Sequence, residues 1–504
     1  MVNNATIMYS WIFMGLFLIA MIYMGWLGMK KTKNSDDFAT ARSSYGFITL
    51  GLAITATIAS GSTFMGMPGL AYSMGAPSLW YPILYPIATV FGMLLIASYV
   101  KKFGDKFGTR TIPEFMGERF NSDFLRIVLA LVSVLLIFYV VSQFVAAATM
   151  FQTMLGLDYN LGLFLTGIVL AAYVFMGGSH SDIMTDAVQG FLMLVIAVVV
   201  IVTFLTGGGA RGGLSGMMDL IKERRPEGSL DVLFKPGDIT YGSAWLVFLL
   251  FVAHIPFSIL PHIGNKFMAI KSGKELKRLI MFCTIVATTL PAMTLGGLLG
   301  IALIDPGANI AADQVIPVLF NELFPPIIAG LFAVAVLSAI MSTSDGLIVS
   351  LTQILANDIY RKTIVPRKGI DPEKAEKVEM IISRYGTFVV LGVAILMAWN
   401  PPQSLSVFLW IGIGGIVSAT AGPLCVGTLW KRSTKTAAIS SMLAGSISYW
   451  VIYLPIGFGF TNPFGAAGIS VLIGMATMYI VTLATAKPSE KEIERVFGSN
   501  DISA

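Results

Sequence analysis

The chain of 504 residues is 56% hydrophobic and only 12% charged, with a formal net charge of +5. Soluble domains carry about 25% charged residues. This composition therefore excludes a soluble enzyme, a soluble nucleic-acid-binding protein and a disordered scaffold. The two cysteines, Cys283 and Cys425, lie in apolar segments, so neither a disulfide framework nor a metal cluster is expected.

Apolar segments long enough to cross a bilayer, about 20 residues each, recur along the whole chain. We predict an all-α integral membrane protein in which residues 1–504 form one membrane domain. Segment 8–28 is interpreted as a retained helix rather than a signal peptide, because no basic residue precedes it and Lys30 and Lys31 follow it. The thirteen predicted spans are 8–28, 47–73, 78–100, 127–152, 160–177, 187–206, 241–264, 279–303, 326–356, 381–399, 405–430, 436–458 and 466–486.

Basic residues are distributed unevenly between the predicted loops. Alternate loops, beginning with 29–46, hold 28 of the 33 lysines and arginines, and the other five lie in the loop 207–240. The positive-inside rule then predicts a plasma (inner) membrane protein with its N-terminus outside and its C-terminus in the cytoplasm. The excess of positive charge thus indicates topology, and no nucleic-acid partner is expected. No lysine or arginine falls in the middle of a predicted span, since Arg384 lies at the edge of 381–399 and is counted with the preceding loop, and the tail 487–504 is expected to be a short solvated end.

Two spans contain glycine and proline where a helix would break. Span 2 carries Gly61, Gly66 and Pro68, and span 7 carries Pro256 and Pro261. The two spans are five apart, so the second enters the membrane in the opposite orientation. Broken helices at matching places are typical of inverted-repeat transporters, although each kink alone could serve packing. We predict a five-plus-five inverted repeat of spans 2–6 (47–206) and 7–11 (241–430).

Span 9 contains oxygen ligands at helical spacing. Ala339, Ser342 and Thr343 are spaced i, i+3 and i+4 and so share one face. One carbonyl and two hydroxyls are hard ligands that suit an alkali cation. The alternative is that both hydroxyls bond back to their own helix.

Two aspartates are candidates for a second cation site. Asp345 lies inside span 9, where a charged residue costs at least ~2.5–3.5 kcal/mol and indicates function. Asp186 is expected at the start of span 6, where a carboxylate can also simply cap the helix. A structural partner or a wet vestibule remains the alternative for Asp345.

At these residues the chain resembles the sodium:solute symporter family over nearly its whole length, and it is most similar to the pantothenate and proline types. The motifs that carry the resemblance follow one another in the family's order. They are Met65–Gly69, Thr111–Phe115 with Glu118–Phe120, Gly177–Gln189, Pro261–Ala269 with Lys266 where arginine is usual, Ala339–Thr343, and Ala398–Pro402.

The resemblance implies a five-plus-five inverted-repeat fold and uptake driven by Na⁺ as the coupling ion. It also implies a Na⁺ site between spans 2 and 9, formed by backbone oxygens of Ala56, Ala59 and Ala339 with the hydroxyls of Ser342 and Thr343. Some members have a second site at the aspartate that corresponds to Asp186, completed by serines just after Ser342. Asp345 and Gly346 stand at those later positions, so Asp345 could bind a cation or a proton.

In this fold the substrate lies beside the broken helices. His262, near the inner end of span 7, is instead expected to brace the following loop. Packing is the alternative role for each candidate. The six candidate substrate-binding residues are Ser60, Thr63, Tyr139, Gln143, His254 and Phe257.

We therefore predict a sodium-coupled symporter that imports a small organic carboxylate or amino acid, such as pantothenate or proline, by alternating access. The alternatives are a proton-coupled symporter of the same fold and, in a different class, a membrane solute sensor. An enzyme is not expected, because three scattered histidines supply no nucleophile–base pair or metal cluster. The expected partners are the solute, Na⁺ and the lipid bilayer, with no obligate protein partner evident.

Overall fold

The computed structural model describes residues 3–400, 405–454 and 462–498, and nearly all of this chain is helical. The long helices are α1 (Asn4–Lys31), α5 (Trp80–Phe107), α8 (Leu136–Leu155), α9 (Tyr159–Leu205), α16 (Pro326–Gln353), α18 (Pro372–Ala398), α19 (Leu405–Ala421), α20 (Lys435–Tyr453) and α21 (Pro463–Ala484). Shorter helices connect or extend them: α2 (Ser35–Thr40), α3 (Phe47–Ile58), α4 (Met67–Met74), α6 (Ile112–Phe120), α7 (Asp123–Ser133), α10 (Gly213–Arg224), α11 (Ala244–His254), α12 (Pro261–Gly264), α13 (Leu276–Thr289), α14 (Leu295–Leu303), α15 (Val315–Leu323), α17 (Val365–Lys368) and α22 (Glu490–Phe497).

The all-helical membrane architecture and both broken helices are confirmed. Within the described residues, 9 helices are long and apolar enough to span a bilayer, or 11 when each bent pair is counted as one span. The bends are 61° between 47–58 and 62–74, and 48° between 244–259 and 261–269. Thirteen stays a prediction for the number of crossings. Residues 401–402 of the last family motif and the predicted end of span 12 at 455–458 lie outside the described residues.

Helix α9 contains predicted spans 5 and 6 joined without a loop. A straight helix of 47 residues would be about 70 Å long. Gly178 interrupts it, because its backbone angles, φ 53° and ψ −135°, are not those of a helix. Gly156, just before α9, lies beside Ile7, whereas Gly177 packs on Gly28 at the other end of α1. After the reversal the chain returns past α3, and Gly208 then packs on α14. The predicted loop 178–186 is therefore wrong, because one glycine makes the turn.

Replacing Gly178 with alanine is expected to lower the free energy of unfolding by at least about 1–3 kcal/mol. Residues other than glycine are strained at this backbone conformation, and an added Cβ would lie 2.5 Å from the Phe38 carbonyl oxygen. The thermal unfolding midpoint of the purified protein measures the effect. Gly392→Ala in α18 is the matched control, since nothing lies within 4 Å of its Cβ position. Equal midpoints for the two variants would contradict the tight reversal.

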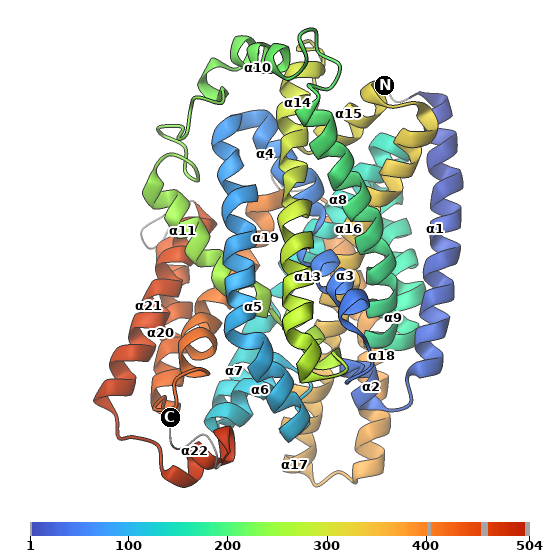
Figure 1. Ribbon diagram of the computed structural model, residues 1–504. Coiled ribbons are helices and arrows are strands. Elements are labelled where there is room, and N and C mark those ends of the chain that lie inside the picture. Colours follow the sequence, from blue (N-terminus) through green and yellow to red (C-terminus); the bar gives the residue numbers. More distant parts are fainter. Residues whose placement is uncertain (1–2, 401–404, 455–461, 499–504) are drawn as a thin grey trace.

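The two ends of the bundle carry different short helices (Figure 1). α4, α10 and α15 lie at the end where the N-terminus lies, and α2, α6, α17 and α22 lie at the opposite end. We call the latter the basic end, because it carries the loops rich in lysine and arginine. The tail is not simply a solvated end as expected, since α22 folds there and buries Val496 and Phe497.

Candidate functional site

The first broken helix leaves three consecutive carbonyl groups without helical partners. α3 ends at Ile58 because Ala59 is extended, at φ −90° and ψ 97°. In a continued helix the amides of Gly61 and Ser62 would donate to the carbonyls of Thr57 and Ile58. Instead, Gly61 N–H donates to Gln143 Oε1 at 2.9 Å, and Ser62 N–H donates to Ser60 Oγ at 3.2 Å. In a low-dielectric interior, freed carbonyls require other donors or a cation.

Hydroxyl groups from two other helices meet those carbonyls. Ser342 Oγ lies 3.1 Å from Ala56 O, and Thr343 Oγ1 lies 3.1 Å from Thr57 O. Both hydroxyls are also 3.2 Å from Ala339 O. The structure thus brings together four of the five predicted sodium ligands, Ala56, Ala339, Ser342 and Thr343, all buried. The next carbonyl, of Ile58, accepts from the Tyr85 hydroxyl at 3.0 Å.

Ala59 is placed differently from the other predicted sodium ligands. The carbonyl beside Thr343 belongs to Thr57, and no hydroxyl of the described residues contacts the Ala59 carbonyl. Its role as a ligand stays a prediction.

A lysine lies in the interior, where no basic side chain was expected. Lys266, assigned by its sequence to a loop, follows α12 and is only 5% exposed. Its ammonium lies 2.9 Å from Asp182 and 2.5 Å from Asp186, and it donates to Thr57 Oγ1 at 2.6 Å. The expectation of an interior without lysine or arginine is therefore wrong. The second broken span continues past its predicted end at 264 as far as Ala269, and this continuation carries Lys266.

Three carboxylates surround this ammonium. Asp182, Asp186 and Asp345 have oxygens within 4.8 Å of one another, and all three are buried. We call them the acidic cluster. Asp345 accepts from Gly346 N–H at 2.8 Å and from Thr185 Oγ1 at 3.4 Å. One oxygen each of Asp182 and Asp186 has no hydrogen-bond partner among the described residues. Because one ammonium balances the charge of only one of the three carboxylates, the acidic cluster could also bind another cation or a proton.

Asp186 does not cap a helix. It lies eight residues past Gly178, two turns inside the second half of α9, so the alternative that it simply caps a helix does not hold. Its carboxylate instead accepts from the Thr57 hydroxyl at 2.7 Å. Because the Thr57 carbonyl accepts from Thr343, Thr57 connects the predicted sodium ligands to the acidic cluster.

Four of the six candidate substrate-binding residues lie beside the break in span 2. Gln143 bonds the backbone there, and the Tyr139 hydroxyl lies next to Ser60. Thr63 is next to Tyr81. All are buried, and they come from α8 and from the break itself. Tyr139 and Gln143 share one face of α8, as their i, i+4 spacing predicts.

The other two candidates, His254 and Phe257, lie in an aromatic cluster. The His254 ring centroid is 4.6 Å from Trp410 and 5.0 Å from Tyr85. Its Nδ1 lies 2.7 Å from the Leu250 carbonyl oxygen of its own helix. Phe257 packs 5.7 Å from Tyr85. These contacts connect span 7 to α5 and α19, and Tyr85 and Trp410 were missed because each lies in an otherwise ordinary apolar segment.

His262 lies beside a candidate substrate-binding residue and also beside the start of the following segment. Its ring centroid lies 5.6 Å from that of Tyr139, and neither ring nitrogen has a partner among the described residues. It also lines, with Asp182 and Lys266, a gap of about 10 Å³. Two unsatisfied buried nitrogens mark His262 as a residue that the sequence interpretation undervalued.

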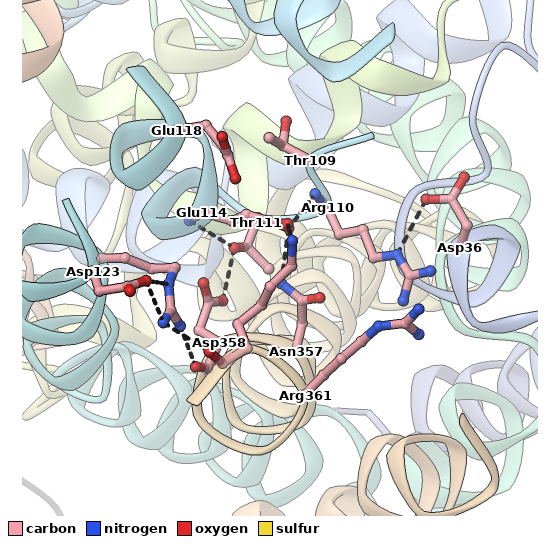
Figure 2. A network of polar contacts seen from close by, with 12 residues as sticks. Asp36, Thr109, Arg110, Thr111, Glu114, Glu118, Asp123, Asn357, Asp358 and Arg361 are labelled. Carbon is pink, nitrogen blue, oxygen red and sulfur yellow. Dashed lines mark hydrogen bonds and ion pairs between the residues drawn. The ribbon is translucent and has the colours of Figure 1, made fainter. Parts of the chain in front are cut away.

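At the basic end, ion pairs join segments that are distant in sequence. Figure 2 shows the Arg110 side chain beside Asp36, with Arg361 on the neighbouring segment. Glu379, fully buried, pairs with Arg110 at 2.7 Å and with Arg361 at 2.5 Å. Asp358 accepts from Thr111 Oγ1 at 2.7 Å. The network joins the extension of α16 (η9, Ile354–Ile364) to α6 and α18, so this end of α16 is held in place.

Comparison with known proteins agrees with this architecture. Residues 38–445 match the sodium:solute symporter family. The chain is 30% identical to the sodium/pantothenate symporter of Haemophilus influenzae, covering 93% of each chain. It is 29% identical to the osmoregulated proline transporter of Bacillus subtilis, covering 96% of each.

A solved structure shares the fold at low sequence identity. The chain superimposes on a Na⁺-coupled sialic acid symporter with a TM-score of 0.77 and 19% identity, covering 96% of this chain and 99% of the other. With its broken helices, its matching family motifs and its relatives, the chain belongs to the sodium:solute symporter family, whose members are membrane transporters coupled to Na⁺.

Proposed function

We propose that the protein imports a small organic solute together with Na⁺, which binds between α3 and α16. The observation that carries this proposal is the contact of Ser342 and Thr343 with carbonyls freed by the break in span 2. A cation bound there would hold two helices together with five hard oxygen ligands, which we propose to be those of Ala56, Ala59, Ala339, Ser342 and Thr343.

The acidic cluster supports a second cation beside the first. Asp186 and Asp345 are the proposed ligands, and Lys266 neutralises only one of the three carboxylates. A proton on Asp345 would satisfy the same charge balance. Coupling to protons is therefore the second candidate function, and the experiment below separates the two.

The solute class we propose is a carboxylate or an amino acid, with proline and pantothenate as the first to test. Two relatives named above transport these solutes by name. The proposed contacts are Ser60, Thr63, Tyr139, Gln143, His254 and Phe257. His262 joins them because neither of its ring nitrogens has a hydrogen-bond partner among the described residues.

The proposed cycle is alternating access between the repeats 47–206 and 241–430, in a plasma membrane with the basic end in the cytoplasm. Na⁺ entering from outside joins α3 to α16 and favours the state in which the basic end is closed. Solute binding then closes the outer path. Opening the inner path requires the pairs of Glu379 with Arg110 and Arg361 to separate, after which α16 moves and the sodium ligands disperse.

Uptake into proteoliposomes tests the proposal. Labelled proline, pantothenate and a short monocarboxylate are offered with an inward Na⁺ gradient or an inward H⁺ gradient. One charge crossing ~100 mV supplies about 2.3 kcal/mol, and a tenfold gradient adds about 1.4 kcal/mol. We expect accumulation of one solute, up to about 500-fold per coupled Na⁺, with Na⁺ alone. Accumulation driven only by the H⁺ gradient would show that the coupling ion is H⁺ and not Na⁺. If none of the three solutes accumulates under either gradient, the proposed solute class is wrong.

A further inference from the structure

A cavity of about 230 Å³ lies at the basic end, between α6, the start of α20 and the C-terminal helix α22. Its lining holds five basic side chains but only one carboxylate, Glu492. That carboxylate is occupied in capping α22, where it accepts from Ser489 N–H at 3.0 Å. The cavity shares no lining residue with the candidate transport site and has no part in the cycle proposed above.

The base of the cavity contains a buried cation without a counter-ion. Arg119 is 6% exposed and donates only to the carbonyls of Gly427 and Trp430, at 2.9 and 3.2 Å. No carboxylate pairs with it among the described residues, and its Nε has no partner. Burial, and then the positive charge of Arg495, lower the pKa of Arg119 to about 10. The Arg119 guanidinium also lies 4.7 Å from the ring centroid of Phe120 and 4.9 Å from that of Phe497, so carbonyls and rings contact it but no negative charge of the described residues balances it.

A second unsatisfied donor lines the same base. The Ser433 hydroxyl is 2% exposed and has no hydrogen-bond partner among the described residues. Lys435 and Lys487 stand exposed at the rim, and neither has an ion-pair partner in the described part of the chain. The cavity thus offers a buried guanidinium and a hydroxyl at its base and two ammonium groups at its mouth.

We infer that this cavity binds a phosphate-bearing anion, with Arg119 and Ser433 contacting the phosphate oxygens and Lys435 and Lys487 drawing it in. Arginine and hydroxyl donors suit phosphate oxygens. The rim lies where α20 begins and α21 has ended, and Trp430 stacks on Tyr479 nearby, at 5.3 Å between centroids. Aromatic rings of this kind mark a membrane interface. The phosphate can therefore belong to an anionic phospholipid headgroup or be free in solution.

The test compares lipid and soluble phosphate on the full-length protein. Nanodiscs of phosphatidylcholine with or without phosphatidylglycerol are prepared, and retained phosphatidylglycerol is measured by native mass spectrometry. In detergent, inorganic phosphate and glycerol 3-phosphate are titrated and the thermal unfolding midpoint is followed. The rim variant Lys435→Gln/Lys487→Gln leaves the buried base intact. Lys274→Gln/Lys277→Gln is the control, since it removes the same charge from another exposed loop of the basic end.

We expect the rim variant to bind the phosphate-bearing anion roughly 10- to 30-fold more weakly than the wild type and the control. If the rim variant loses only its retained phosphatidylglycerol, the ligand is a lipid headgroup. If it loses only the shift of the unfolding midpoint that soluble phosphate causes, the ligand is a free anion. Equal binding by the rim variant and the control would overturn the inference. A chain shortened after Gly498 is expected to bind like the wild type. If only the shortened chain binds, residues 499–504 fill the cavity and the inference is wrong.

Discussion

Replacing Lys266 with methionine is expected to lower the free energy of unfolding by about 3–5 kcal/mol. The substitution leaves Asp182 and Asp186 buried without the ammonium that contacts both. Intrinsic tryptophan fluorescence during thermal unfolding in detergent measures the loss. Lys266→Arg keeps the charge and is expected to retain most of the stability.

The control is the same substitution at an exposed ion pair. Lys377 pairs with Glu373 at 2.7 Å with both side chains more than 70% exposed, and such pairs contribute about 1 kcal/mol or less. Lys266→Met combined with Asp182→Asn and Asp186→Asn removes all three charges and is expected to recover part of the loss. If Lys266→Met and Lys377→Met unfold at the same temperature, the acidic cluster does not depend on the ammonium.

Replacing Ser342 with alanine is expected to raise the Na⁺ concentration that gives half-maximal uptake by roughly 10- to 100-fold. The substitution removes one of the proposed oxygen ligands, and an unsatisfied buried partner costs about 1–3 kcal/mol. The Ala56 carbonyl also loses its hydroxyl contact. Initial uptake rates over a Na⁺ series at fixed solute concentration measure the change.

Ser344 provides the matched control on the same helix. Its hydroxyl donates to the Ile340 carbonyl of α16 at 2.7 Å, and among the described residues no hydrogen bond joins it to α3. Ser344→Ala is therefore expected to keep the wild-type Na⁺ dependence. Unchanged Na⁺ dependence in Ser342→Ala, or an equal shift in both variants, would show that the assigned site is wrong.

The backbone breaks were predictable from the sequence because their causes are local. The break in span 2 falls at the extended Ala59, two residues before Gly61, and the break in span 7 falls at the extended Leu260, directly before Pro261. The spacing of Ser342 and Thr343 likewise fixed their common face. The structure agrees at each of these points.

The acidic cluster was only partly predictable, because its partners are distant in sequence. Residues 179–186 are polar, so hydropathy placed them in a loop. They are helical and buried because Asp182 and Asp186 find Lys266 about eighty residues later. Lys266 looked like an ordinary loop lysine for the same reason. Charge pairing across spans leaves no periodic signal in either segment alone.

The reversal at Gly178 also bears on how the chain enters the bilayer during synthesis. The second half of α9 starts with Ser179, His180, Ser181 and Asp182, which partition poorly into hydrocarbon on their own. A turn of one residue couples this polar start to the apolar stretch before it. We therefore expect the two halves of α9 to insert as one hairpin. The apolar first half would then bring the polar residues 179–182, including Asp182 of the acidic cluster, into the bilayer.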